Sequence, residues 1–202
     1  VAVGWEIRVV LGGGLNVVKA GAEPWGAQPF VQAQQLGTAD AVKSANPGAI
    51  EGNVLILNGD HPLIESTDIS QFMDEFEDSG MDIGVVTAKL KYPREFGRIV
   101  RHKGQLAAIV EAKDASSETL KINEVNTGIY LVKADVLVDC LAKISNHNAK
   151  KEYYLTDMIS IGLSDHLKVG AILGNKKVAA GVNNQAELAK ATRLIFQRKA
   201  LE

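Results

Sequence analysis

The sequence predicts an α/β fold with a mostly parallel sheet that is flanked by helices. Two short runs of branched apolar residues, 54–57 and 83–88, are typical of strands buried on both faces. The stretch between them, residues 66–79, carries apolar side chains at helical spacing, which are Ile69, Phe72, Met73 and Phe76. A strand, a helix and a second strand at this distance are typical of a βαβ unit, which joins parallel strands.

Length and composition predict one domain with a packed core. The chain has 202 residues, of which 46% are hydrophobic and 23% charged. Its net charge of −2 gives no electrostatic reason to expect nucleic-acid binding, and no apolar run is long enough to span a membrane. The single cysteine, Cys140, excludes an internal disulfide and is expected in the core. We therefore expect a cytoplasmic protein without nucleic-acid or membrane partners.

The first fifty residues are expected to form a strand at 7–11, a short helix at 15–20, an extended segment at 30–32 and a helix from residue 39. Thr38 is the expected N-cap of that last helix. Three glycines, 12–14, follow the first strand. They predict a tight turn, because they lack the spacing of GxGxxG and the lysine of a P-loop. The alternative is a loop that cradles phosphate through its backbone N–H groups.

The rest of the chain alternates strands and helices. The helix 66–79 is expected to begin at Ser66 or Thr67 and to end at Gly80. Residues 97–101 and 105–110 are separated by a glycine-containing turn and predict a β-hairpin. The remaining expected elements are an irregular, lid-like loop at 112–123, a strand at 126–132, helices at 134–144 and 155–163, and a strand at 169–173.

A last helix is expected after Asn184, which has the capping-box spacing to Glu187. We expect this helix to turn three apolar side chains towards the core, namely Leu188, Leu194 and Ile195.

Asp60 is the residue whose position most suggests a binding site. It follows the apolar run 54–57 and Gly59, so it lies just beyond the carboxyl end of the expected strand. Ligands of open parallel sheets bind at such ends, and a carboxylate there suits a hard divalent cation. The same spacing also fits an ordinary Gly-Asp turn after a core strand. His61 is interpreted as structural.

Seven short motifs occur in order along most of the chain. They are residues 32–38 (QAQQLGT), 57–63 (LNGDHPL), 96–99 (FGRI), 109–115 (IVEAKDA), 124–128 (EVNTG), 152–157 (EYYLTD) and 181–184 (GVNN). In sequence, order and spacing this set resembles the uridylyltransferase domain of bacterial bifunctional N-acetylglucosamine-1-phosphate uridylyltransferases, which also carry a glucosamine-1-phosphate acetyltransferase domain.

The resemblance implies a fold and a reaction. The fold would be a Rossmann-like, mostly parallel sheet flanked by helices, of the nucleotide-diphospho-sugar transferase type. A β-hairpin sugar-binding subdomain would be inserted at about residues 94–131. The reaction would join UTP to N-acetylglucosamine 1-phosphate, giving UDP-N-acetylglucosamine and pyrophosphate with Mg²⁺, by in-line attack of the sugar phosphate on the α-phosphorus.

The resemblance also implies roles for eight residues. Asp60 would be the catalytic metal ligand, with Asn183 as the second Mg²⁺ ligand. The uracil would lie against Gln32, Gly37 and Thr38. The sugar would lie against Gly97, Glu111 and Asn126. Read without the family, Glu111 could instead be a solvated strand end, Asn126 a turn former and Asn183 a neighbour of a helix cap.

Two parts of the family pattern are absent. The opening strand with its glycine-rich, arginine-containing phosphate loop does not occur, and neither do the hexapeptide repeats of the acetyltransferase half. We therefore expect residues 1–202 to be a single nucleotidyltransferase domain that is incomplete at its N-terminus. We expect its catalytic activity to be severely impaired on its own. A homo-oligomer would form through a domain outside these residues.

Two other functions stay open. One is a different sugar-1-phosphate nucleotidyltransferase, such as one that makes dTDP-glucose. The other is a nucleotide-sugar-binding domain without catalysis. The resemblance of 32–38 and of the pair Glu111 and Asn126 favours the N-acetylglucosamine enzyme.

Overall fold

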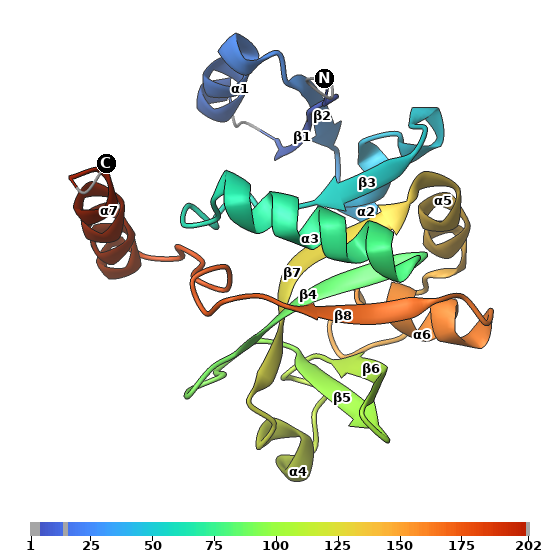
Figure 1. Cartoon of the computed structure of the whole chain (residues 1–202). Helices are drawn as coiled ribbons and strands as arrows, with labels where there is room; N and C mark the ends of the chain where they lie inside the picture. The colour runs from blue at the N-terminus through green and yellow to red at the C-terminus, as the bar shows by residue number, and fades with distance from the viewer. Residues whose placement is uncertain (1–4, 14–15, 201–202) are drawn as a thin grey trace.

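The structure is a computed structural model that describes residues 5–13 and 16–200 (Figure 1). Its strands are β1 Arg8–Gly12, β2 Gln28–Gln32, β3 Asn53–Ile56, β4 Ile83–Lys89, β5 Arg98–His102, β6 Gln105–Val110, β7 Glu124–Lys133 and β8 Val169–Leu173. Its α-helices are α1 Asn16–Ala22, α2 Thr38–Ser44, α3 Ser66–Ser79, α4 Ser117–Leu120, α5 Ala134–Lys143, α6 Asp157–Ser164 and α7 Gln185–Lys199. Two 3₁₀ turns lie at Glu23–Trp25 and Pro47–Ala49.

The main sheet is mixed and has six strands. Its order is β6-β5-β7-β4-β8, and β3 pairs with the second half of β7. Strands β4 and β8 are parallel, whereas β7 is antiparallel to both β3 and β4 and lies between them. Strands β3, β4 and β8 therefore run in one direction, as the βαβ pattern predicts, and β7 runs against them. The α/β class with helices flanking the sheet is confirmed. The expectation of a mostly parallel sheet is wrong for the described residues, because β7 and the hairpin β5–β6 pair antiparallel and only β4 and β8 pair in parallel in the main sheet.

The two larger parts of the core in the described residues are apolar layers, one on each face of the main sheet, and a smaller cluster contains Ala88, Val125 and Ala179. Alternate residues of β7 belong to different layers, because successive side chains of a strand point to opposite faces. Tyr130 and Val132 pack with α5 and α6, whereas Ile129 and Leu131 pack with Phe72 and Phe76 of α3.

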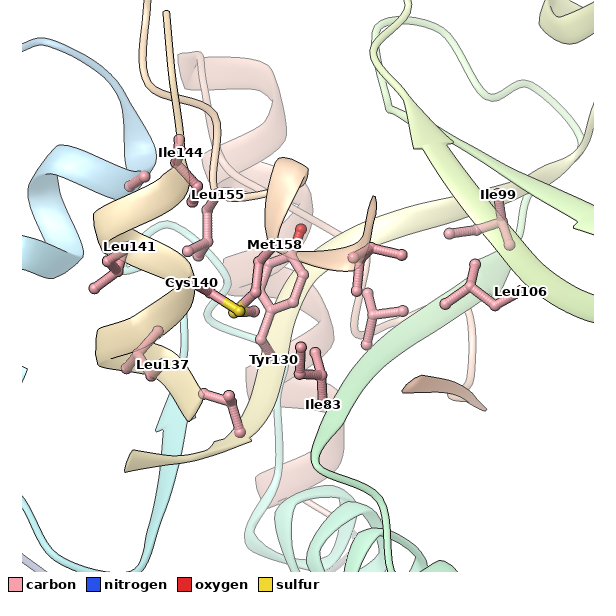
Figure 2. Packing of buried hydrophobic residues seen from close by; sticks show 14 residues of the cluster. Ile83, Ile99, Leu106, Tyr130, Leu137, Cys140, Leu141, Ile144, Leu155 and Met158 are labelled. Atoms are coloured by element: carbon pink, nitrogen blue, oxygen red, sulfur yellow. The ribbon is translucent and has the colours of Figure 1, made fainter. Parts of the chain in front are cut away.

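Figure 2 shows the layer beneath α5 and α6, including Cys140, which is buried as predicted. Burial raises the pKa of its thiol to about 11, so the group stays protonated at neutral pH.

Strand β3 is less buried than its apolar sequence predicts. Val54, Leu55 and Ile56 are only half-buried, and Leu57 is 41% exposed. The expectation of a strand buried on both faces is therefore wrong for the part of the chain that the structure describes. The reason is that β3 has a hydrogen-bonded neighbour on one side only, which is β7.

Strands β1 and β2 form a separate, parallel two-stranded sheet (Figure 1). The guanidinium of Arg8 in β1 ties this sheet to the end of α2, because it donates to the carbonyl oxygens of Ala45 at 2.7 Å and Asn46 at 2.6 Å. The predicted strand at 7–11 and extended segment at 30–32 are confirmed. Of the three glycines 12–14, Gly12 is the last residue of β1 and Gly14 lies outside the described residues, as does Leu15 of the helix predicted at 15–20.

The predicted hairpin β5–β6 is confirmed, and its glycine-containing turn has two residues in the structure. Lys103 and Gly104 both have positive φ, at 50° and 82°. Positive φ at both central residues is the requirement of a type I′ turn, whose twist matches that of the flanking strands. The loop expected at 112–123 contains one short helix, α4, whose N-terminus is capped by the Ser116 side chain.

Two helix caps differ from the expected ones. The residue before α2 is Gly37, and the Thr38 hydroxyl instead accepts a hydrogen bond from the Leu155 backbone N–H at 2.9 Å. The residue before α3 is Glu65, whose N–H donates to Asp68 at 3.0 Å. The predicted N-cap at Thr38 and the predicted cap at Ser66 or Thr67 are therefore wrong, whereas Gly80 ends α3 as predicted with φ 65°.

Helix α7 is capped as predicted but does not pack as predicted. The Asn184 side chain accepts from the Glu187 N–H at 2.9 Å. Leu188 and Leu194, expected in the core, are 46% and 38% exposed, and Ala191 is the buried residue of the helix. Figure 1 shows α7 at one side of the molecule, away from the sheet. Among the described residues, no helix combines the length and apolarity needed to cross a membrane.

Candidate functional site

The Asp60 loop is anchored to the segment that precedes Asn183. The Val182 N–H donates to the Asp60 carbonyl oxygen at 2.9 Å. A Cβ placed on Gly181 would lie 3.3 Å from the Asp60 carboxylate, so the side chain lies against this segment. The Asp60 side chain is 43% exposed and can be reached by a ligand. The structure therefore brings the two residues predicted to hold a metal into neighbouring, hydrogen-bonded segments.

The chemistry of these groups fits Mg²⁺. A carboxylate and an amide oxygen are hard ligands, and Mg²⁺ commonly takes one or two protein oxygens while phosphate and water complete its shell. Residues 5–13 and 16–200 contain no cluster of three or more His, Cys, Asp or Glu side chains that could hold a metal by themselves. An ion at Asp60 would therefore complete its shell with an amide oxygen, phosphate or water.

His61 lies beneath this loop. Its side chain is 5% exposed, and its Nε2 atom lies 3.6 Å from the Asp60 carboxylate. The burial agrees with its interpretation as a structural residue. Its Nδ1 atom is buried without a hydrogen-bond partner in the described part of the chain.

The three residues predicted to hold the uracil surround the start of α2. Gln32 at the end of β2 is buried, and its Nε2 atom donates to the Gly37 carbonyl at 3.1 Å and to Asp40 at 2.8 Å. Both amide hydrogens are thereby used within the protein. A ligand could approach only the amide oxygen, which is an acceptor.

Backbone contacts hold the same segment against residues 153–155. Gly37 has φ 120°, and an added Cβ would lie 2.6 Å from the Tyr153 carbonyl oxygen. The Thr38 hydroxyl accepts from the Leu155 N–H, as described above. Both residues therefore have a structural reason to be present that is independent of any nucleotide.

The three residues predicted to hold the sugar lie in one row across three strands. Arg98 of β5 pairs with Val110 of β6 and with Val125 of β7. One step along these antiparallel registers places Gly97 opposite both Glu111 and Asn126. The contacts agree, because the Asn126 N–H donates to the Gly97 carbonyl at 2.9 Å, and an added Cβ at Gly97 would lie 3.5 Å from the Glu111 carboxylate.

Glu111 contributes the carboxylate of this row and is half-buried. Burial raises its pKa, while a hydrogen bond from the Thr156 hydroxyl at 3.3 Å and the charge of Lys150 oppose that rise. The carboxylate lines a pocket of about 260 Å³ whose wall is formed by Glu95, Glu111, Ala112, Lys113, Lys150 and Tyr154.

Sequence reasoning assigned no binding role to Thr156, Tyr154 or Lys150. Thr156 and Tyr154 belong to the motif 152–157, so the sequence did mark their segment. Lys150 precedes the motif, and only the structure places it at this pocket.

Asn58 connects the loop around Asp60 with the row formed by Gly97, Glu111 and Asn126. A Cβ at Gly128 would lie 2.2 Å from the Asn58 amide nitrogen, so the Asn58 side chain lies directly on the Gly128 backbone. Gly128 follows Asn126 by two residues and has φ 79°. The loop that carries the predicted metal residue Asp60 therefore contacts β7 two residues from the predicted sugar residue Asn126.

Comparison with known proteins identifies the family of the chain. Residues 18–180 match the nucleotidyl transferase family. The chain is 62% identical over 196 residues to the bifunctional protein GlmU of Bdellovibrio bacteriovorus, and the match covers 97% of this chain and 43% of that protein. The chain thus spans less than half the length of this relative.

Two solved structures share the fold. A nucleoside-diphosphate-sugar pyrophosphorylase from Vibrio cholerae has a TM-score of 0.66 at 14% identity, with 94% of this chain and 81% of that chain covered. A UDP-glucose pyrophosphorylase in complex with UDP-glucose has a TM-score of 0.68 at 12% identity, with 96% of this chain and 81% of that chain covered. With the family match over most of its length, the chain belongs to the nucleotidyl transferase family.

Proposed function

We propose that the protein transfers the uridylyl group of UTP to N-acetylglucosamine 1-phosphate, forming UDP-N-acetylglucosamine and pyrophosphate in the cytoplasm. The observation that carries the proposal is the row formed by Gly97, Glu111 and Asn126, which lies beside the Asp60 loop. The 62% identity to a bifunctional GlmU protein supports the same choice among nucleotidyl transferases.

The reaction needs positioned substrates more than covalent catalysis. A phosphate oxygen of the sugar phosphate attacks the α-phosphorus of UTP, and the bond from that phosphorus to the bridging oxygen of the β-phosphate breaks. Pyrophosphate leaves with the bond electrons. Holding the attacking oxygen and the α-phosphorus in line supplies a large part of such a rate enhancement.

The uracil would lie beside Gln32, Gly37 and Thr38. Because both amide hydrogens of Gln32 are used within the protein, its amide oxygen is the atom left to accept from the uracil N3–H. The base would lie against the backbone of Gly37, whose position is fixed by the close contact with Tyr153.

The phosphates would lie at the Asp60 loop. Asp60 and Asn183 would hold Mg²⁺, which neutralises charge on the phosphate oxygens when it is bound. The hydrogen bond from Val182 to the Asp60 carbonyl keeps the two ligand-bearing segments together.

The sugar would lie in the subdomain at about residues 94–131, against the row described above. Glu111 would accept hydrogen bonds from sugar hydroxyls or from the acetamido N–H, and Asn126 would pair with a polar group of the same ring. Gly97 would leave the Glu111 carboxylate uncovered, because an added Cβ there would lie 3.5 Å from its oxygens.

A substrate panel tests this proposal. The purified full-length protein is supplied with UTP or dTTP, and with N-acetylglucosamine 1-phosphate or glucose 1-phosphate, and pyrophosphate release is measured with Mg²⁺. We expect the fastest release with UTP and the N-acetylated sugar. A preference for dTTP and glucose 1-phosphate would overturn the choice in favour of the dTDP-glucose type. Binding of UDP-N-acetylglucosamine without turnover would indicate a non-catalytic domain.

A further inference from the structure

The side-chain amide of Asn126 is held at both of its ends. Its Oδ1 atom accepts from the Gly128 backbone N–H at 2.9 Å, and its Nδ2 atom donates to the Tyr130 hydroxyl at 2.8 Å. A flipped amide would point its NH₂ group at the Gly128 N–H, which is also a donor. The two contacts together fix both the plane of the amide and the direction in which it faces.

The Tyr130 hydroxyl is an unusual feature of an apolar layer. Figure 2 shows the Tyr130 ring among Cys140, Leu155 and Met158, and the residue is 2% exposed. Burial raises the pKa of the phenol, and the carboxylates of Glu111 and Asp157 raise it further, so the group is neutral. A phenylalanine would fill the same space, so packing alone does not explain the oxygen.

The fixed amide has one donor and one acceptor position left. One Nδ2 hydrogen is used by Tyr130 and one lone pair of Oδ1 by Gly128, which leaves the second hydrogen and the second lone pair. Asn126 itself is half-buried, so a ligand can reach it. A sugar hydroxyl can accept from one of these positions and donate to the other.

We propose that Tyr130 is a positioning residue for sugar binding, whose hydroxyl holds the Asn126 amide in the orientation that a sugar hydroxyl requires. The proposal rests on the function proposed above, because it assumes that Asn126 contacts the sugar. Tyr130 itself lies beneath Asn126 and touches no substrate.

The test is the affinity for UDP-N-acetylglucosamine, measured by isothermal titration calorimetry on the full-length protein with and without Tyr130→Phe. We expect the dissociation constant to rise about 3- to 10-fold, the effect of losing one ordinary hydrogen bond. The affinity for UTP should stay unchanged, since UTP has no N-acetylglucosamine ring that could contact Asn126. Tyr92→Phe, at a residue that is 69% exposed, is the matched control and should leave both affinities unchanged.

A double-mutant cycle separates positioning from a general effect on packing. If Tyr130 acts through Asn126, then Tyr130→Phe should have no further effect in an Asn126→Ala background. An equal loss in both backgrounds would overturn the proposal. So would unchanged sugar-nucleotide affinity in Tyr130→Phe, although the proposed function would then stand. A parent protein that binds no UDP-N-acetylglucosamine would overturn the proposed function and this inference together.

A measurement on the parent protein keeps the proposal testable if Tyr130→Phe fails to fold. The Nδ2 hydrogen of Asn126 that is bonded to the Tyr130 hydroxyl should exchange slowly with solvent in the absence of ligand, as followed by NMR. Rapid exchange of this hydrogen would show that the amide is not held, and would overturn the inference.

Discussion

Gly37 and Tyr153 meet backbone to backbone, although 116 residues separate them in the chain. The Tyr153 N–H donates to the Leu36 carbonyl at 2.8 Å, and the Ala39 N–H donates to the Tyr153 carbonyl at 2.9 Å. The loop proposed to bind uracil is therefore hydrogen-bonded to the segment that carries Thr156. Thr156 is in turn the hydrogen-bond partner of Glu111 in the proposed sugar site.

Replacing Gly37 by alanine should be strongly destabilising. The position has φ 120°, and the new Cβ would lie 2.6 Å from the Tyr153 carbonyl oxygen. Backbone strain and the forced separation of the two segments together should lower the free energy of unfolding by about 2 to 4 kcal/mol. Urea denaturation followed by circular dichroism measures this. Gly48→Ala, where the added Cβ meets nothing within 4 Å, is the control, and equal stability of the two variants would contradict the explanation.

The Thr38 hydroxyl should matter through Leu155. Thr38→Val keeps the shape of the side chain but removes the oxygen that accepts from the Leu155 N–H at 2.9 Å. Leaving that N–H without its partner should lower the free energy of unfolding by about 1 to 2 kcal/mol. Thr38→Ser retains the hydroxyl and should recover most of the loss in the same urea titration. If serine and valine variants were equally unstable, the hydroxyl would not be the cause.

Asp60 should affect activity far more than stability. Its side chain is 43% exposed, so Asp60→Asn should leave the thermal midpoint within a few degrees of the parent. Loss of the charged metal ligand should lower the rate of pyrophosphate release in the full-length protein by about 100-fold or more. Raising the Mg²⁺ concentration should recover part of that rate.

The matched control for Asp60→Asn is Asp74→Asn, which removes an exposed carboxylate from α3. It should change neither the rate nor the Mg²⁺ dependence. A full rate in Asp60→Asn at all Mg²⁺ concentrations would remove Asp60 from the proposed metal site.

Local sequence patterns predict those elements whose causes are local. The hairpin β5–β6 and helix α3 depend on a glycine turn and on apolar spacing, which are both visible in the sequence. The burial of β3 and the packing of α7 depend instead on which elements lie beside them. An apolar run shows what a strand could bury, whereas its number of neighbours in the sheet decides what it does bury.

The candidate site also combines features that local sequence predicts with features that depend on tertiary contacts. The resemblance to a family selected Gly97, Glu111 and Asn126, but their meeting depends on the register of three strands. Thr38 shows how a local rule fails, because a residue with good N-cap chemistry uses its hydroxyl for a distant backbone N–H. Lys150 carries no local signal at all, and its place at the pocket follows from the path of the chain before Tyr153.

The pH dependence of stability should reveal the burial of Glu111. Burial raises the pKa of this carboxyl in the folded state, so the folded protein binds the proton more tightly than the unfolded chain does. Its contribution to stability is therefore largest at low pH, and it decreases as the pH rises from the ordinary glutamate pKa through the raised one. Glu111→Gln removes this titration while keeping the size of the side chain.

The stability of Glu111→Gln relative to the parent should therefore increase as the pH is raised from about 4 to about 7. Urea denaturation at several pH values measures the difference, and Glu118→Gln, at an exposed glutamate, should show no such trend. The same Glu111→Gln variant should bind UDP-N-acetylglucosamine more weakly, because a neutral amide accepts hydrogen bonds less strongly than a carboxylate. A pH-independent stability difference would mean that the folded structure does not perturb Glu111, whereas unchanged sugar binding would remove it from the proposed sugar site. The pH dependence of stability thus reports the electrostatic cost of burying this carboxylate, and the affinity for UDP-N-acetylglucosamine reports its proposed role in sugar binding.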